Sequence, residues 1–447
     1  MELSDLPSID ALAAELSHAF ELPAPIITDA ARRAVDTSRV ELRSGRDADP
    51  TGIATALLTD VAAARPRRVI NATGVLLHTN LGRAPVAIAT ADTAGMILTG
   101  TSNVEIDVRT GRRSKRHDYL DTLIPLVTEA EAGFAVNNNA GALLLALASV
   151  AGNGGRVAVS RGELIEIGGS FRLPDLMAAS GAELVEVGTT NRTRAADYAS
   201  VVDTVDAILK VHPSNYRIDG FSQETTYGEL AELAAQNGVS FIADVGSGLI
   251  DEQAPWLSGC DRSWLAGEPG VIQTIRTGAD LVLFSGDKLF GGPQGGIIVG
   301  KTEAVTRAKK HPIARAVRLD GSSLAAIAST FELYAGQRIS QIPFWSMVCA
   351  TLDEIESRSQ AVIDGIDEAI SIVDGASIPG AGSAPGATIP TRLIRLDGDA
   401  DRSWSKLAQA PTPVIASRRD GSVYIDLRSV LPGDDVAVRA ALISAIA

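Results

Sequence analysis

The sequence predicts an α/β fold built on a mostly parallel sheet, with a small helical domain before it and an α+β domain after it. Between residues 67 and 310, short runs of Val, Ile and Leu alternate with helical patterns and glycine-rich turns. Near-continuous apolar strands separated by helices indicate a mostly parallel sheet covered on both faces. The flanking segments differ in pattern, and a chain of 447 residues is long enough for two or three domains.

Each of the three predicted domains has its own elements. The helical domain, residues 1–66, has helix-like stretches at 9–20, 29–42 and 53–64. The large domain, residues 67–310, has its candidate strands at 134–136, 156–160, 183–187, 207–211, 240–243, 281–284 and 296–299. The small α+β domain, residues 311–447, has helical patterns at 324–333 and 347–372, a loop at 375–390, and strands at 391–396, 413–417 and 423–427.

Composition narrows the class of protein. The formal net charge of −14 argues against indiscriminate nucleic-acid binding, although the basic run at 111–117 could touch RNA phosphates or an anionic substrate, or be an ordinary solvated loop. The apolar runs are shorter than the roughly 20 residues that cross a bilayer, so we expect a cytoplasmic protein. Cys260 and Cys349 are too few for a disulfide framework or a cysteine zinc site, and we expect buried or incidental thiols and no metal.

The segment SGDKLFGGPQGG, residues 285–296, places Lys288 directly after an apolar strand and before a glycine-rich turn. Ligands of open α/β sheets bind at such strand ends. A solvated surface lysine is the alternative, but the glycines permit backbone conformations and close approaches that side chains would block. Ser285 could supply a hydroxyl group to a phosphate.

A carboxylate, Asp244 in FIADVGSG, ends another apolar strand one helix and one strand before Lys288. Enzymes that use pyridoxal phosphate need a carboxylate against the pyridine nitrogen, because a protonated ring withdraws electrons from the substrate. Asp244 could instead cap the following helix or bind a metal. Together with Lys288 it favours a pyridoxal-phosphate site.

A third pattern, VNNNAGALLLAL at residues 136–147, turns a short strand into a helix. Backbone N–H groups at Asn139, Ala140 and Gly141 would then offer a seat for the cofactor phosphate. The alternative is a buried helix with an asparagine cap.

Several further side chains stand near predicted strand ends or in polar loops. Arg161, Glu163, Glu166, His212 and Asn215 would face the cofactor or substrate, although His212 could be a hydrogen-bonded core histidine. Arg83 ends a polar loop at 70–85. Arg315 and Arg318 are spaced to share one helical face and could hold an oxyanion, or simply be solvated.

Seven segments, in this order, resemble the bacterial selenocysteine synthase family, the seryl-tRNA(Sec) selenium transferases. They are INATGVLLHTNLGRAP, NNNA, SRGELIEIGGSFRLPD, EVGTTNRT, KVHPSNYRIDGF, DVGSG and SGDKLFGGPQGGIIVGK. The resemblance is strong over residues 67–334 and looser in the tail, which includes IPGAGSAPGATIPT. It implies an aspartate-aminotransferase-type (fold type I) architecture and pyridoxal 5′-phosphate as the cofactor.

The resemblance also implies roles and partners. Lys288 would bind the cofactor as a Schiff base, Asp244 would partner its pyridine nitrogen, and Arg83, Arg315 and Arg318 would bind anions. Residues 1–66 would grip the tRNA, and the chain would assemble as a decamer built from dimers, with composite active sites. Seryl-tRNA(Sec) would lose its β-hydroxyl and gain selenium from selenophosphate.

Two other functions stay open at this point. One is a pyridoxal-phosphate lyase or transferase of the same fold that acts on a small amino acid or an amino sugar phosphate, for which the N-terminal domain has no evident use. The other is a catalytically silent tRNA-binding scaffold, which the presence of both Lys288 and Asp244 disfavours.

Overall fold

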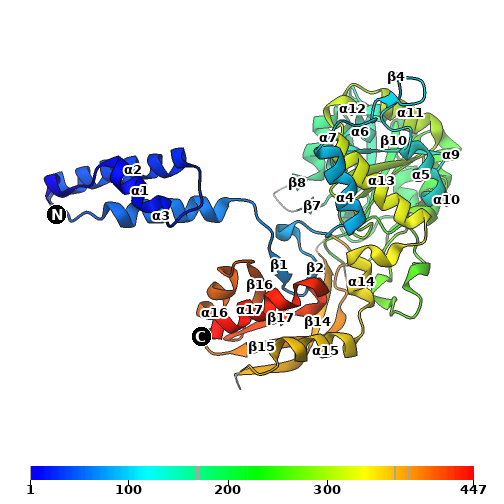
Figure 1. The fold of residues 1–447 in the computed structure, drawn as a ribbon. Helices are drawn as coiled ribbons and strands as arrows, with labels where there is room; N and C mark the ends of the chain where they lie inside the picture. The colour runs from blue at the N-terminus through cyan, green and yellow to red at the C-terminus, as the bar shows by residue number, and fades with distance from the viewer. Residues whose placement is uncertain (1, 168–170, 219, 367–368, 381, 447) are drawn as a thin grey trace. The chain divides into compact units, whose positions relative to one another are not determined.

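The computed structural model describes the chain except residues 1, 168–170, 219, 367–368, 381 and 447, and it divides into two compact units, Met1–Arg68 and Val69–Ala447 (Figure 1). Five of the predicted motifs or segments reach these excluded positions, and those parts lie outside the described residues. They are SRGELIEIGGSFRLPD at 168–170, KVHPSNYRIDGF at 219, the helical pattern 347–372 at 367–368, and both the loop 375–390 and the segment IPGAGSAPGATIPT at 381. Among the described residues, no helix has both the length and the apolar character that crossing a membrane requires.

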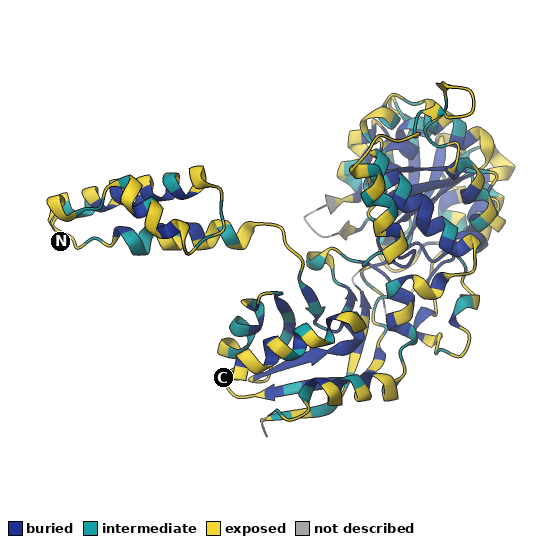
Figure 2. Cartoon of the chain, in the orientation of Figure 1, coloured by how far each residue is buried: buried dark blue, intermediate teal, exposed yellow. Residues whose placement is uncertain are grey.

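The first unit consists of three helices, α1 (Ile9–Ser17), α2 (Ala24–Arg43) and α3 (Pro50–Ala64). Side chains that accept N–H groups start two of them: Ser8 Oγ accepts from Ala11 N at 3.1 Å, and Asp49 Oδ1 accepts from Gly52 N at 2.8 Å. Buried apolar side chains from all three helices form a core of their own, including Leu12, Ile27 and Leu58. The outer faces of the helices are largely exposed (Figure 2).

The second unit contains the predicted sheet. In spatial order its strands are β5 (Ala132–Val136), β13 (Gly296–Gly300), β12 (Leu281–Ser285), β11 (Ser240–Gly246), β10 (Ala207–Val211), β6 (Arg156–Ser160) and β9 (Glu183–Val187). All neighbouring pairs from β12 to β9 are parallel, and β13 runs antiparallel to both of its neighbours. The mostly parallel sheet is therefore confirmed.

Alternation of side chains along these strands explains why they are apolar throughout. In β12, Val282 and Phe284 join one hydrophobic cluster, whereas Leu281 and Leu283 join the other. Successive side chains point to opposite faces of a sheet, so a sheet covered on both faces needs apolar residues at every position. Figure 2 shows the resulting buried strands beneath helices whose outer sides are exposed.

A second sheet combines segments from both ends of this unit. Its order is β1 (Ile70–Ala72), β16 (Val414–Arg419), β17 (Ser422–Asp426), β15 (Ile389–Asp397), β14 (Ile370–Gly380) and β2 (Val75–Leu77). Residues 70–77 thus pair with strands from the C-terminal part of the chain.

Two predictions for the C-terminal part were wrong. The helical pattern at 347–372 is broken into α14 (Pro343–Cys349) and α15 (Leu352–Ile363), because Thr351 and Glu354 form a capping box that starts a new helix, and β14 begins at Ile370. The predicted loop at 375–390 is strand as far as Gly380, since pairing with β15 and β2 offsets the low strand propensity of its glycines.

Cys260 and Cys349 form a disulfide, so the prediction of two separate thiols was also wrong. Their Cα atoms are 5.4 Å apart, although 89 positions separate them in the sequence. Trp256 and Trp345, a few residues from each cysteine, pack with their ring centroids 5.3 Å apart. This tertiary contact, which has no local sequence pattern, brings the two sulfurs together.

Reduction of this disulfide is expected to lower the free energy of unfolding by about 2–4 kcal/mol, because the bond restricts a long loop in the unfolded chain. Urea unfolding with and without a reductant measures the effect. A Cys260→Ser/Cys349→Ser variant serves as the control, because the reductant should not shift its midpoint. Equal midpoints for the oxidised and reduced native chain would contradict the prediction.

Candidate active site

A cavity of about 270 Å³ lies where β11 and β12 end and α6 (Asn139–Ala151) begins. Its lining includes Lys288, Asp244, Asn139, His212, Ser285 and Arg83. The carboxyl ends of parallel strands meet at one edge of a sheet, which is why residues far apart in the sequence share this cavity.

Lys288 is 5% exposed and lies in the turn that follows β12. Burial lowers the pKa of its ammonium group, and the charge of Arg83 lowers it further, while Asp244, Asp287 and Glu268 act in the opposite direction. The lowered pKa makes the neutral amine, which is the nucleophilic form, easier to reach than in a solvated lysine. The turn depends on glycine at Gly296, where a Cβ would collide with the backbone carbonyl of Asn138.

Asp244 is buried near the end of β11, where the pairing with β12 shifts register between Asp244 and Gly246. Such bulges change the direction of a side chain. Asp244 Oδ1 accepts hydrogen bonds from Asn139 Nδ2 at 2.8 Å and from Gly246 N at 3.0 Å. Burial raises the pKa of this carboxyl group, and the Asn139 bond and the charge of Lys288 oppose that rise.

The start of α6 differs in detail from the predicted phosphate seat. Asn138 caps the helix, because its Oδ1 accepts from Gly141 N at 2.8 Å. Asn139 and Ala140 line the cavity, whereas Gly141 is not among its lining residues. The side chain of Asn139 binds Asp244, and its Oδ1 is buried without a hydrogen-bond partner among the described residues.

Three other predicted residues also line the cavity. His212 follows β10, its backbone N donates to Asp244 O at 2.9 Å, and its Nε2 lies 3.4 Å from Glu268 Oε2. Ser285 is the last residue of β12 and is buried. Arg83 has a positive φ of 61°, and its Nη1 lies 2.8 Å from Asp287 Oδ2, so an acidic neighbour of Lys288 holds this guanidinium in place.

The remaining predicted residues do not line this cavity. Arg161 Nε lies 2.8 Å from Glu186 Oε2, and Asn215 Nδ2 donates to Glu166 O at 2.8 Å, both in exposed positions. Glu163 instead binds the ammonium group of Lys210. These side chains follow strand ends as predicted, but they find polar partners outside the cavity.

Arg315 and Arg318 do not share a helical face, so this prediction was wrong. The short helix α12 (Ile313–Ala316) ends before Arg318, whose backbone forms an isolated bridge with Val136. Arg318 Nη1 lies 3.3 Å from Glu105 Oε1. Pairing with the sheet edge overrides the helical spacing.

Sequence reasoning missed Glu268 and the segment at 382–387. Glu268 is 4% exposed and accepts from Ala384 N at 2.7 Å. Burial acts to raise its pKa, but hydrogen bonds and the charge of His212 outweigh burial and lower it. A Cβ on Gly382 would lie 3.0 Å from Lys288 Nζ, so this segment closely covers the lysine. Its glycine-rich sequence was assigned to a connecting loop.

The cavity fits pyridoxal phosphate on the chemistry of its side chains. It offers a buried amine for the aldehyde, a buried carboxylate for the ring nitrogen, and the start of α6 for the phosphate. The unpartnered Oδ1 of Asn139 is a further buried polar atom that a bound molecule can satisfy.

This sheet order, with the lysine and the aspartate at one edge, defines a pyridoxal-phosphate-dependent enzyme of the aspartate-aminotransferase type. The chain is similar in structure to D-glucosaminate-6-phosphate ammonia-lyase, with a TM-score of 0.60 over 86% of this chain and 96% of that one. At 17% identity, this likeness describes the fold alone.

The family is more specific. The family model for L-seryl-tRNA selenium transferase matches residues 69–431. The L-seryl-tRNA(Sec) selenium transferase of Geobacter sulfurreducens is 40% identical, covering 94% of this chain and 93% of that protein. The protein of the same name from Hyphomonas neptunium is 39% identical, covering 97% and 96%. The chain belongs to the L-seryl-tRNA selenium transferase family.

Proposed function

We propose that Lys288 and Asp244 carry the chemistry by which this chain, a pyridoxal-phosphate-dependent seryl-tRNA(Sec) selenium transferase, makes selenocysteine on its tRNA. The observation that carries the proposal is that both side chains are buried and line one cavity. Membership of the family favours this function over action on a small amino acid or an amino sugar phosphate.

The roles follow from the environments of the side chains. When bound, the cofactor supplies an electron sink that makes the α-proton of the seryl group acidic. Lys288 would hold the cofactor through its Nζ and, once the amino group of the substrate has displaced it, its buried amine of lowered pKa would take the α-proton. Asp244, oriented by Asn139, keeps the ring nitrogen protonated. The seryl group would lose its α-proton and β-hydroxyl as water, selenium from selenophosphate would add at the β-carbon as a proton returns to the α-carbon, and the phosphoryl group of the donor would pass to water as phosphate.

Selenophosphate is the proposed selenium donor, with arginines offsetting its negative charge. Arg83 lines the cavity and supports this role directly. Arg315 and Arg318 lie outside the cavity of their own chain, so their proposed role depends on an assembly in which active sites are composite.

A homo-oligomer, a decamer built from dimers, is the proposed assembly. Support comes from α4 (Ile88–Leu98), where Ile88, Met96 and Leu98 are 81%, 67% and 72% exposed, and from Val108, which is 73% exposed. A group of large exposed apolar side chains is typical of a protein interface.

The N-terminal unit is proposed to bind the tRNA, and the site of action is proposed to be the cytoplasm, where charged tRNA is found. The arginines of α2 and of the turn after it support RNA binding, because they are exposed and can neutralise phosphates. They are Arg32, Arg33, Arg39, Arg43 and Arg46. Arg32 and Arg39 also lie within ion-pair distance of Asp29 and Asp36.

A direct assay tests the proposed function. tRNA(Sec) charged with labelled serine is incubated with the holoenzyme and selenophosphate, the ester is hydrolysed, and the amino acids are separated. Labelled selenocysteine is the expected product. Free labelled serine is the matched control, and its equally fast conversion would contradict a tRNA-bound substrate.

Replacing Arg315 or Arg318 with alanine is expected to slow selenium transfer at least tenfold and to leave the visible absorbance of the bound cofactor unchanged. The physical reason is that each guanidinium group would offset the negative charge of selenophosphate without touching the cofactor. Initial rates over a range of selenophosphate concentrations measure the effect. Arg307→Ala is the control, since this exposed-face arginine of α11 (Thr302–Lys310) has no proposed role. Unchanged selenophosphate kinetics would reject the role.

A further inference from the structure

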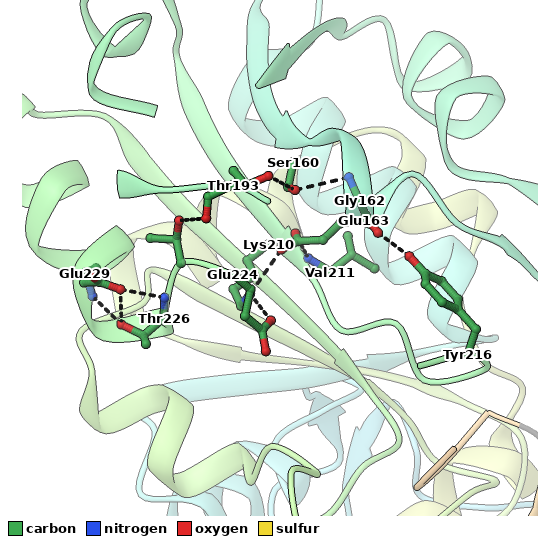
Figure 3. Close-up of polar contacts among 11 residues, drawn as sticks. Ser160, Gly162, Glu163, Thr193, Lys210, Val211, Tyr216, Glu224, Thr226 and Glu229 are labelled. Atoms are coloured by element: carbon green, nitrogen blue, oxygen red, sulfur yellow. Dashed lines mark hydrogen bonds and ion pairs between the residues drawn. The ribbon is translucent and has the colours of Figure 1, made fainter. Parts of the chain in front are cut away.

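A second cavity, of about 450 Å³, adjoins the first, and His212 lines both. Its wall includes the ends of β6 and β10, the turn 189–193 and the segment 263–269. Figure 3 shows polar contacts of several residues that line it, among them Glu163, Lys210 and Glu224. None of the roles proposed above uses this cavity.

In the buried part of the second cavity, the carboxylates of Glu163 and Glu268 outnumber the single ammonium group of Lys210. Lys210 Nζ lies 3.1 Å from Glu163 Oε1 and 3.0 Å from Glu224 Oε2, and Glu163 Oε2 also accepts from Val211 N at 2.9 Å (Figure 3). The side chains of Lys210 and Glu163 are only 4% and 8% exposed. The buried ammonium is therefore matched by carboxylates, which disfavours a small multiply charged anion such as selenophosphate in this cavity.

Aromatic side chains with unpartnered polar atoms make up another part of the wall. Trp264 is 6% exposed, and Tyr227 lies beneath Lys210, whose Nζ is 5.2 Å from its ring centroid. The hydroxyl of Tyr227 and the indole Nε1 of Trp264 are both buried, and neither has a hydrogen-bond partner among the described residues. A bound flat heteroaromatic ring that meets the polar edges of these side chains can accept their hydrogen bonds through its ring nitrogens.

One short segment joins the second cavity to Lys288. Gly382 lies against Lys288 Nζ, and Ala384, two positions later, lines the second cavity. Two residues span at most about 7 Å. Further along, a Cβ on Gly386 would lie 3.7 Å from the guanidinium carbon of Arg217, an exposed residue of the same cavity. The second cavity is thus close to the amine, and Arg217 lies at its exposed side.

We propose that the second cavity binds the 3′-terminal adenosine of seryl-tRNA, the nucleoside whose ribose carries the seryl ester. The adenine ring lies against Trp264 and Tyr227, and the 5′-phosphate of the nucleotide faces Arg217. The seryl ester on the ribose reaches past Gly382 towards Lys288. The cavity volume falls within the roughly 300–1,000 Å³ of small-molecule sites. This inference rests on the proposed function, because it names the site for one end of the same substrate.

AMP is the probe that tests this proposal with the holoenzyme. Equilibrium binding is measured directly, and inhibition is measured against seryl-tRNA(Sec). Thr190→Trp places a large side chain at an exposed position of the cavity wall, and Thr101→Trp makes the same change at an exposed position outside it. Tyr227→Phe removes one hydroxyl and retains the ring. Ribose 5-phosphate tests recognition of the base.

AMP is expected to bind and to compete with seryl-tRNA(Sec), and ribose 5-phosphate to bind at least tenfold more weakly. Thr190→Trp should weaken AMP binding and raise KM for seryl-tRNA(Sec) at least tenfold, with the cofactor absorbance unchanged. Tyr227→Phe should weaken AMP binding severalfold, and Thr101→Trp should leave it unchanged.

Two results would overturn the proposal while leaving the proposed function intact. They are turnover of seryl-tRNA(Sec) without AMP binding, and AMP binding that Thr190→Trp does not affect. A wild-type holoenzyme that binds AMP but makes no selenocysteine would instead contradict the proposed function.

Discussion

Lys288→Ala is expected to reduce selenocysteine formation by at least about 10⁴-fold. Loss of a positioned base alone costs about 10²–10⁴-fold, and this change also removes the amine that holds the cofactor covalently. Initial rates with charged tRNA(Sec) measure the loss, and the visible absorbance of the lysine-bound cofactor should disappear with it.

Lys301→Ala is the matched control for this variant. Lys301 follows β13 in the same unit, and its Nζ lies 2.8 Å from Asp280 Oδ1 in a half-exposed position. This variant should keep both the rate and the absorbance. Retention of the absorbance in Lys288→Ala would mean that another lysine binds the cofactor.

Asp244→Asn is expected to lower kcat by about 10²–10³-fold while the cofactor remains bound, an effect similar in size to removing one preorganised electrostatic partner. The amide is nearly isosteric with the carboxylate, so packing around Asn139 is retained. An amide cannot hold a proton on the ring nitrogen by charge, and the electron sink is therefore weakened. Single-turnover rates with charged tRNA(Sec) separate this effect from substrate binding.

Asp280→Asn provides the comparison, because Asp280 lies just before β12, at the opposite edge of the sheet. Its Oδ2 accepts from Phe241 N at 2.7 Å. This variant should lose some stability but keep a kcat within about threefold of the native value, well below the effect expected of a lost electrostatic partner. A kcat for Asp244→Asn in the same range would show that the carboxylate charge has no catalytic role.

The central sheet was predictable because each strand is buried on both faces. A run such as residues 281–284 leaves no polar position that a solvated loop or an amphipathic helix would need, and the structure extends that strand by one residue. The second sheet was harder, because β1 and β2 are three residues long and pair with strands more than 300 positions away. Local sequence holds no information about such partners.

In the candidate site, too, some residue positions follow from the sequence pattern and others depend on tertiary contacts. Lys288 follows one apolar strand of the central sheet and Asp244 lies near the end of its parallel neighbour, so topology alone brings them to one edge. The orientation of Asn139 towards Asp244 depends on a rotamer and on a strand bulge. The disulfide of Cys260 and the bridge of Arg318 to Val136 depend on tertiary contacts. Spacing in the sequence therefore predicted the strand-end residues and missed those placed by packing.

Identifying the lysine that binds the cofactor tests the proposed role of Lys288 most directly. The holoenzyme is reduced with borohydride and digested, and the peptides are sequenced by mass spectrometry. We expect a pyridoxyl group on the peptide SGDKLFGGPQGG, attached at Lys288. A pyridoxyl group on Lys210, Lys301 or any other lysine would contradict the proposed role of Lys288.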